Sequence, residues 1–414
     1  MAREMKDSGV AWIGEIPSDW KLSKIGSLYS QRIEKVSDKD YPPLSVTMKG
    51  ILPQLATAAK SDDGDNRKLV RIGDFAINSR SDRRGSCGVS LYDGSVSLIN
   101  IILTPRNTMN SGYYDWLFHT SLFADEFYKW GHGIVDDLWT TRWQEMKSII
   151  VPVPNLHEQE RIAHFLNQRC AEIDTVLDKT RTSIEEYKKL KQAIITQAVT
   201  KGIRGDRPMK ESGVIWLDTV PAEWTISKIK YTIFPKEKPV LPMDEVITCF
   251  RDGTVTLRRN RREEGFTISF TENGYQGVDV GDLVIHGMDA GAIGCSDSRG
   301  KTSPVVHVCS TVGNNRYFMY FLRYMAYSGV LMDFSNGVRI RSSDFRNFKK
   351  LAVFEMLVPP LREQNKIVDY LDSTLAKIDQ VIKQKEILIS ELEACKKSAI
   401  YEYVTGKREV PNAY

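Results

Sequence analysis

The segment Met5–Trp12 reads MKDSGVAW, and the segment Met209–Trp216 reads MKESGVIW. The same offset of 204 residues (209 minus 5) carries Ile16–Trp20, IPSDW, onto Val220–Trp224, VPAEW. Matches this rich in Trp, Pro and Gly are very improbable by chance. The chain is therefore an internal repeat, which predicts two copies of one structural unit.

Two further pairs of segments extend the repeat. Val70–Ile77 (VRIGDFAI) matches Val278–Ile285 (VDVGDLVI), and the alternating apolar residues around Gly-Asp predict a strand and a tight turn. Val153–Gln159 (VPNLHEQ) matches Val358–Gln364 (VPPLREQ). The prolines end the preceding structure, and a long polar–apolar pattern begins directly after them. Between these segments the two copies diverge, which indicates that each copy recognises something different.

Each copy closes with a long predicted helix, residues 157–200 in the first and 363–405 in the second. Neither contains Pro or Gly before Gly202 and Gly406, and apolar residues recur at heptad spacing. At ~1.5 Å per residue each helix would be roughly 60–65 Å long. We predict an antiparallel coiled coil whose seam includes Leu166, Ile173, Leu177, Ile184, Leu371, Ile378, Ile382 and Ile389. The alternative is two amphipathic helices, each packed on its own domain. Lys191, Lys385 and Lys396 also fall at seam positions and would mark where the pair splays or meets another protein.

The predicted fold class is α+β, with two α/β domains in pseudo-twofold repeat and two long helices. The domains follow chain order: a first globular domain at 1–153, a helical spacer at 154–204, a second globular domain at 205–358 and a C-terminal helical spacer at 359–414. The repeated tryptophans beside prolines, such as Trp20 and Trp224, are predicted to be packing anchors.

Composition is that of an ordinary globular protein, with 42% hydrophobic residues and a net charge of +4, which permits nucleic-acid binding without demonstrating it. The six cysteines lie far apart and form no C-x-x-C pair, so neither zinc nor a disulfide framework is expected. No apolar run approaches the roughly 18–20 residues of a membrane span, and Met1–Asp7 is followed by no apolar stretch typical of a secretory signal. We expect a cytoplasmic protein.

Catalytic signatures are missing from the sequence. Gly300–Thr302 (GKT) resembles the end of a phosphate-binding loop, but Cys295 stands where that loop needs a glycine. No N-P-P-Y-type tetrapeptide of amino-methyltransferases occurs. We therefore predict no catalytic residues, no metal site and no cofactor in this chain.

Direct reading of base edges requires forked donors and amides on projecting loops, with Arg or Lys for guanine and Asn or Gln for adenine. Such groups cluster in both copies, although arginine clusters also neutralise phosphates, and the sequence does not separate the two roles. Asn314–Arg316 and Arg341 are alternatives. The candidates are Asn78, Arg80, Arg83 and Arg84 in the first copy, and Arg251, Arg258, Arg259, Asn260, Arg261, Arg262, His286 and Arg339 in the second.

The motif E-I-P-x-x-W at Glu15–Trp20, the Gly-Asp pairs, and P-x-x-x-E-Q at Pro154–Gln159 before a long helix resemble the specificity subunit of Type I restriction–modification enzymes. The resemblance covers nearly the whole chain. The second copy departs from it with Thr219 in place of glutamate. A G-x-R motif late in the second domain, Gly337–Arg339, stands where the first copy has Gly133–Val135.

This resemblance implies two target recognition domains, each reading one half of a split, asymmetric double-stranded DNA site. The paired helices would set the spacing and dock two methyltransferase subunits, and restriction subunits would join that core. S-adenosylmethionine, ATP and Mg²⁺ would be bound by those partners. Two alternatives from other classes are a duplicated scaffold that binds protein or glycan, and an enzyme with an unrecognised site.

Overall fold

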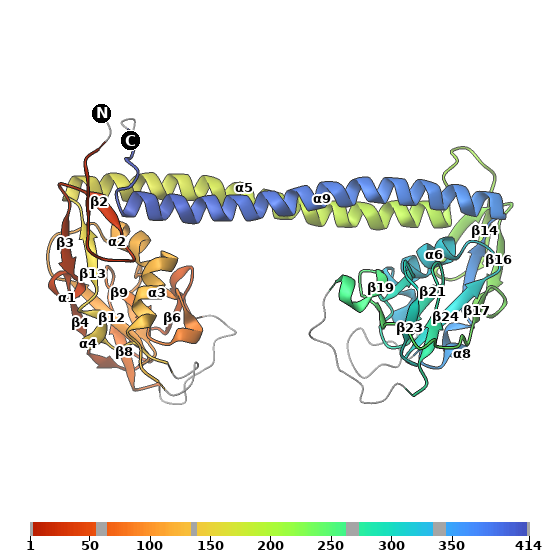
Figure 1. Ribbon diagram of the computed structural model, residues 1–414, viewed down its shortest axis with the longest axis horizontal. Helices are drawn as coiled ribbons and strands as arrows, with labels where there is room; N and C mark the ends of the chain where they lie inside the picture. The colour runs from red at the N-terminus through yellow and green to blue at the C-terminus, as the bar shows by residue number, and fades with distance from the viewer. Residues whose placement is uncertain (1–2, 55–63, 134–138, 262–272, 334–344, 412–414) are drawn as a thin grey trace. The chain divides into compact units, whose positions relative to one another are not determined.

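The computed structural model describes residues 3–54, 64–133, 139–261, 273–333 and 345–411. Its contacts form two compact units, of which the first comprises Met1–Arg181 with Glu386–Tyr414 and the second Thr182–Lys385. Each unit contains a globular part and a portion of both long helices (Figure 1). We call the globular parts head 1, residues 3–153, and head 2, residues 205–358. The predicted four segments follow chain order, whereas the contacts group each head with parts of both helices.

Head 1 is built on a four-stranded sheet with the order β10-β9-β12-β4. A three-stranded sheet, β11-β8-β5, and the β6–β7 hairpin lie beside it, and helices α2 and α3 complete the core (Figure 1). The bounds are β4 Tyr29–Arg32, β5 Lys35–Val36, β6 Leu44–Thr47, β7 Gly50–Pro53, β8 Arg67–Val70, β9 Phe75–Asn78, β10 Cys87–Val89, β11 Gly94–Val96, β12 Asn100–Pro105, α2 Ser111–Phe118 and α3 Ser121–Lys129.

Head 2 has a four-stranded sheet with the corresponding order, β22-β21-β24-β17, accompanied by the β20–β23 and β18–β19 pairs and helix α6. Gly300–Thr302 forms strand β23, so the sequence resembling a phosphate-binding loop is part of a sheet. The bounds are β17 Ile233–Pro235, β18 Ile247–Cys249, β19 Val255–Leu257, β20 Gln276–Val278, β21 Leu283–His286, β22 Ile293–Cys295, β24 Val306–Thr311 and α6 Asn315–Tyr327.

The remaining strands close the heads at their ends. In head 1, β1 (Met5–Asp7) pairs with β2 (Glu15–Pro17), and β3 (Lys21–Lys24) pairs with β13 (Ile150–Val153). Head 2 repeats this with β14 (Met209–Val214) on β15 (Leu217–Pro221), and β16 (Thr225–Lys228) on β25 (Glu355–Val358). Every ladder between these described strands is antiparallel. The description of each head as α/β was therefore wrong in the strict sense: each is α+β.

The Gly-Asp pairs form the predicted turn between two strands. Gly73 and Gly281 have φ values of 87° and 85°, a region that favours glycine. The Asp74 carboxylate accepts a hydrogen bond from the Arg71 backbone N–H at 2.9 Å, and Asp282 accepts one from Asp279 at 2.8 Å. The aspartates thus hold the turn, and the strand–turn prediction is confirmed.

The two predicted long helices are confirmed as α5, Leu156–Thr200, and α9, Leu361–Val404. Each begins two residues after a proline, Pro154 or Pro359. Each ends before a glycine with positive φ, Gly202 at 81° or Gly406 at 72°, as helix C-termini commonly do.

Within each unit, ion pairs join the two helices in antiparallel order. In the first unit Asp174 pairs with Lys396 at 2.6 Å and Arg181 with Glu393 at 2.7 Å, so rising numbers on α5 meet falling numbers on α9. In the second, Lys191 pairs with Asp379, and the Lys385 ammonium lies 5.8 Å from the Tyr187 ring centroid. We expected these lysines to mark where the two helices splay apart. That expectation was wrong, because the side chain of each lysine contacts the opposite helix.

The predicted seam positions are buried, with one exception. Ile389 is half-buried, whereas the other residues are at most 9% exposed: Leu166, Ile173, Leu177, Ile184, Leu371, Ile378 and Ile382. The core of head 1 continues into Tyr403 and Val404 of α9, and the core of head 2 continues into Ile195 and Val199 of α5. Each head is therefore packed against the end of the helix that belongs to the other copy. Among the described residues, no helix combines the length and apolar character that crossing a membrane requires.

Candidate nucleic-acid interface

A cleft of about 530 Å³ in head 1 is lined by three predicted residues, Asn78, Arg83 and Arg84, together with residues that lie far from them in sequence. One side consists of β6 and its turn, from Leu44 to Met48, and the other of the β9–β10 loop, with Arg83 and Arg84. Asn100 also lines the cleft, and its buried Oδ1 has no hydrogen-bond partner among the described residues.

Hydrogen bonds within head 1 hold the loop that carries Arg80, Arg83 and Arg84. The Asn78 carboxamide accepts a hydrogen bond from the Arg80 backbone N–H at 3.0 Å, and Ser81 donates to the Trp139 carbonyl at 3.1 Å. Asn78 is only 6% exposed, so its side chain fixes the loop that carries the arginines. Arg83 and Arg84 are exposed, and Arg84 forms an ion pair with Asp125.

The basic residues of head 2 are likewise exposed and paired with acids. Arg251 meets Asp289 at 2.5 Å, Arg259 meets Glu245 at 3.0 Å, and Arg261 meets Asp252 at 2.7 Å. The Arg261 guanidinium also lies 4.4 Å from the centroid of the Phe250 ring. Such pairs hold each guanidinium along the protein surface, where a phosphate could exchange with the carboxylate.

Other predicted residues of head 2 have local roles. Arg258 contacts the Thr248 hydroxyl at 3.3 Å, and the Asn260 amide donates to Thr256 at 2.9 Å. Burial lowers the pKa of His286, with Asp289 opposing this shift and Arg251 acting in the same direction, which favours the neutral imidazole. Arg262 and Arg339 lie outside the described residues.

The two arginine clusters occupy different loops. Arg80–Arg84 follow β9, whereas Arg258–Arg261 follow β19, the second strand of a hairpin. The head 2 counterpart of the β9–β10 loop, residues 287–292, contains Asp289 and no arginine. The main sheets of the two heads thus have the same strand order, and the heads differ in which loop carries the arginines. Sequence alone paired the clusters only by copy and did not distinguish these loops.

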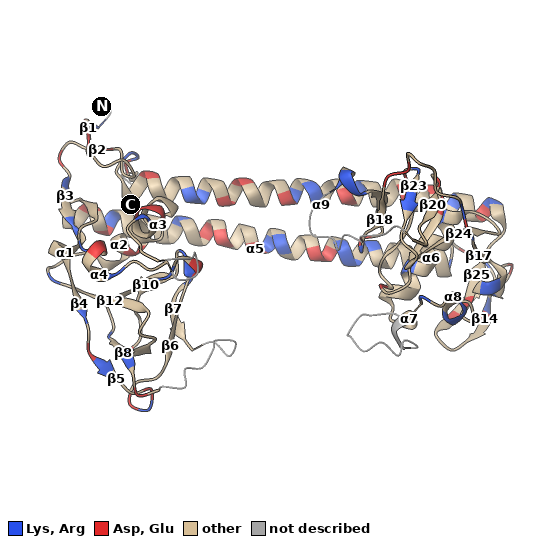
Figure 2. Cartoon of the chain, turned by 60° about the horizontal axis from the view of Figure 1, so that its bottom comes forward, with Lys and Arg blue, Asp and Glu red and all other residues tan. Residues whose placement is uncertain are grey.

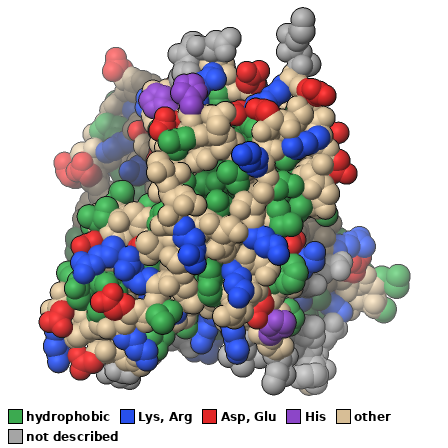
Figure 3. All heavy atoms as spheres, turned by 90° about the vertical axis from the view of Figure 1, so that its left-hand side faces the viewer, with side chains coloured by type: hydrophobic (Ala, Val, Ile, Leu, Met, Phe, Trp, Pro, Cys, Tyr) green, Lys and Arg blue, Asp and Glu red, His purple; other side chains and the backbone are tan. Residues whose placement is uncertain are grey.

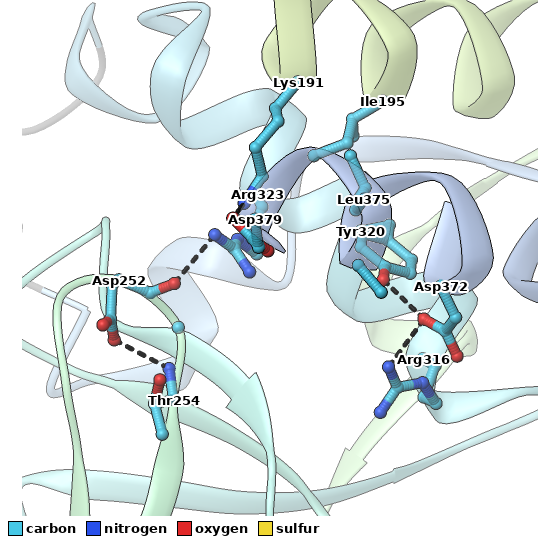
Figure 4. A pocket seen from close by; sticks show the side chains of 12 residues that line it. Lys191, Ile195, Asp252, Thr254, Arg316, Tyr320, Arg323, Asp372, Leu375 and Asp379 are labelled. Carbon is cyan, nitrogen blue, oxygen red and sulfur yellow. Dashed lines mark hydrogen bonds and ion pairs between the residues drawn. The ribbon is translucent and has the colours of Figure 1, made fainter. Parts of the chain in front are cut away.

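The alternative candidates Asn314, Asn315 and Arg316 have structural partners. Asn314 caps α6, its side chain accepting from the Arg316 backbone N–H, and Asn315 donates to the Gly281 carbonyl at 2.8 Å. Arg316 belongs to a polar cleft of about 750 Å³ within the second unit, lined by α5, α6, α9 and the β18–β19 turn. Figure 4 shows Arg316 and Tyr320 converging on Asp372, each at 2.6 Å, while Arg323 reaches the Asp252 carbonyl at 2.8 Å.

The repeated Glu-Gln of each helix start attaches that helix to its head. The Glu158 carboxylate accepts from the Trp20 indole N–H at 2.8 Å, and Glu363 accepts from Trp224 at 2.9 Å. An arginine completes each cluster, Arg3 at Glu158 and Arg207 at Glu363. We call these two clusters the tryptophan–glutamate anchors. Trp20 and Trp224 are at most 1% exposed, as predicted for packing anchors.

The adjacent glutamines make the second attachment. Gln159 accepts from the Asn110 backbone N–H and donates to the Pro154 carbonyl, both at 2.9 Å. Gln364 repeats both bonds with Asn314, at 2.9 Å, and Pro359, at 2.8 Å. The P-x-x-x-E-Q motif is therefore structural in both copies: it fixes the direction in which each long helix leaves its head.

Charge is mixed over the surfaces drawn in the figures. Along α5 and α9, basic and acidic residues are interspersed (Figure 2). On the face of head 1 shown in Figure 3, lysines and arginines are interspersed with acidic and hydrophobic side chains. This face is therefore not a uniformly basic surface. Among the described residues, no group of three or more His, Cys, Asp or Glu side chains is arranged to hold a metal ion.

The fold, a repeated antiparallel head with two long helices, is shared with solved structures of one class. A chain from a type I R-M system, solved in work on complex assembly and conformational transition, superposes with a TM-score of 0.69 at 13% identity, covering 95% of this chain and 99% of that one. The HsdS subunit from Thermoanaerobacter tengcongensis gives 0.50 at 14% identity, with coverages of 95% and 98%. These likenesses define the fold.

Curated sequences agree with that class. The type I restriction enzyme MjaVIII specificity subunit of Methanocaldococcus jannaschii is 22% identical over 435 residues, covering 96% of this chain and 95% of its own length. A second protein of the same organism is 20% identical, and the alignment covers 96% of both chains. Its name, the type I restriction enzyme MjaX specificity subunit, is a provisional one. No family model matches. The resemblance seen in the sequence is confirmed: the chain is similar along nearly its whole length to type I restriction enzyme specificity subunits.

Proposed function

We propose that this chain is the DNA-reading subunit of a type I restriction–modification complex, with each head contacting one half of a two-part double-stranded site. The observation that carries the proposal is that the two heads have the same fold but different exposed side chains. Both heads have the same strand order in the main sheet, yet their exposed basic residues come from different loops. Two heads of the same fold that present different side chains are suited to bind two different half-sites of an asymmetric DNA sequence.

In this proposal α5 and α9 form one antiparallel coiled coil along their whole length, and the copies are related by a pseudo-twofold axis. The buried seam and the helix-bridging ion pairs within each unit support this arrangement. The coiled coil sets the distance between the half-sites and docks two methyltransferase subunits, which restriction subunits join. The chain itself is not catalytic and acts in the cytoplasm. S-adenosylmethionine, ATP and Mg²⁺ belong to the partners.

We assign the arginine clusters chiefly to phosphates. Carboxylates hold Arg84, Arg259 and Arg261 along the protein surface, an arrangement that serves electrostatic attraction better than a fixed fork aimed at a base edge. Phosphate contacts release counterions, so binding that depends on them weakens as salt rises.

Replacing Arg83 and Arg84 together by alanine should weaken binding to all duplex sequences and lower the slope of log K against log salt by roughly two. The measurement is fluorescence anisotropy of the full chain with random-sequence duplex DNA over a salt series. Arg169→Ala is the matched control, because Arg169 is exposed on α5 and paired with Glu172.

Salt-independent binding, or no binding to duplex DNA, would contradict the proposal and favour a duplicated scaffold for protein or glycan. Methyl transfer to DNA by the purified chain without partners would instead favour the enzyme alternative.

A further inference from the structure

The β6–β7 hairpin of head 1 ends in a short exposed turn that the sequence did not single out. Met48 is 72% exposed, and Lys49 beside it is also exposed. Lys49 forms no ion pair with another described residue, in contrast to Arg84 nearby. Among the described residues, neither the Met48 nor the Lys49 side chain contributes to a core or to an ion pair, so core packing and ion pairing do not account for them.

Hydrogen bonds and a close backbone contact nevertheless hold this turn in place. Thr47 accepts a hydrogen bond from the Lys49 backbone N–H at 3.0 Å and donates to the Gly50 carbonyl at 2.9 Å. Gly50 has a φ of 96°, and a Cβ on Gly88 of β10 would collide with the Gly50 backbone. The hairpin therefore sits directly on the main sheet, with no room for a side chain between them. A fixed turn presents its side chains at little entropic cost.

In head 2 a hairpin turn packs against the main sheet in the same way, but the residues at its tip are different. Gly253 of the β18–β19 turn has a φ of 87°, and a Cβ on Gly294 of β22 would collide with its backbone. Its exposed tip residues include Arg251, which reaches Asp289 in the β21–β22 loop. In head 1 Met48 likewise lies toward the corresponding loop, because both line the same cleft with Arg83 and Arg84. The mounting is common to the heads, and the side chains at the tip differ.

We propose that Met48 and Lys49 contact base edges in the half-site of head 1 and determine which letters it reads. The proposal rests on the function proposed above. Lys49 suits the O6 and N7 acceptors of guanine, and Met48 suits an apolar edge such as the thymine methyl group. Met48 lines one cleft with Arg83 and Arg84, and Lys49 follows Met48 in the turn. In this arrangement the tip enters a groove while Arg83 and Arg84 contact the adjacent phosphates.

The test uses the chain assembled with methyltransferase subunits and selection of bound duplexes from a random library. Wild type, Met48→Ala and Lys49→Ala are compared with Arg83→Ala and with Ile215→Ala, a fully exposed apolar residue at the β14–β15 turn of head 2. Lys49→Ala should lose roughly tenfold or more discrimination at one base pair of one half-site. The other half-site should be unchanged. Arg83→Ala should weaken all sequences alike, and Ile215→Ala should do neither.

Each outcome decides a separate claim. A wild-type motif that both tip variants leave unchanged, or a tip variant that weakens all sequences equally, overturns the assignment of the tip and leaves the proposed function standing. The absence of any wild-type motif overturns both. Thermal unfolding of each variant verifies folding, and Lys49→Gln, which keeps the side chain's polarity without its charge, replaces Lys49→Ala if that variant unfolds.

Discussion

Replacing Glu363 by alanine should reduce the unfolding free energy of the second unit by about 3–5 kcal/mol, the usual effect of removing one partner from a buried charge pair. Glu363 is 4% exposed, and it accepts hydrogen bonds from the Trp224 indole and the Arg207 guanidinium. Without this carboxylate, the indole N–H loses its acceptor, and the largely buried guanidinium keeps only its contact with Glu223. Denaturant unfolding of the full chain, followed by intrinsic tryptophan fluorescence, measures the change.

The matched control is Asp369→Ala, which removes an exposed carboxylate from the same helix and should change stability by less than roughly 0.5 kcal/mol. Equal stability of the Glu363 and Asp369 variants would show that the tryptophan–glutamate anchor is not a structural support.

The same anchor gives a pH dependence. Burial alone would raise the pKa of Glu363, but hydrogen bonds from Arg207 and Trp224 together with nearby positive charge bring it below its ordinary value of 4.5. A carboxyl whose folded-state pKa is lowered stabilises the protein above its unfolded pKa, and this contribution is lost as pH falls through the folded value. Wild type should therefore lose stability below about pH 4.5 more steeply than Glu363→Ala.

Inserting one heptad into each long helix, after Arg181 in α5 and after Lys385 in α9, should lengthen the gap between the two half-sites while both sequences stay the same. Seven residues add about 10 Å of helix, which corresponds to roughly three base pairs of duplex. A heptad preserves the phase of the seam, so the ion pairs within each unit persist. Selection of bound duplexes by the assembled complex reads the gap directly.

A four-residue insertion at the same positions is the control, because it shifts the seam out of phase and should reduce binding rather than produce a clean new gap. An unchanged gap in the heptad variant would exclude the role of the helices in setting the spacing.

The frame of the molecule was predictable because its signals are local. Pro154 and Pro359 ended one element, the glycines at 202 and 406 ended the next, and heptad spacing identified nearly all the buried seam. The Gly-Asp pairs indicated a turn because an aspartate can bond the backbone a few residues away, as Asp74 and Asp282 do. The strict α/β description of the heads was wrong because strand direction depends on pairings that single strands do not reveal.

The candidate site was less predictable because its contacts are long-range. Glu158 and Trp20 are 138 residues apart in sequence, so only the fold shows that the E-Q motif anchors a helix. Asn78 resembled a base-reading amide, yet it is buried as the support of its loop. The β6–β7 tip was missed because Met48 and Lys49 match no residue type expected in a turn, and their prominence depends on the approach of Gly50 to Gly88.

Sequence selection by the wild-type complex, from a library of random duplexes at moderate salt, tests the central claim most directly. We expect two short groups of fixed letters, different from each other and separated by a constant gap. Exchanging residues 30–150 for the equivalent region of another such chain should then alter one group and spare the other. A single uninterrupted motif, or recovered duplexes with no shared letters, would contradict the claim that two differently surfaced heads each read their own half of one site.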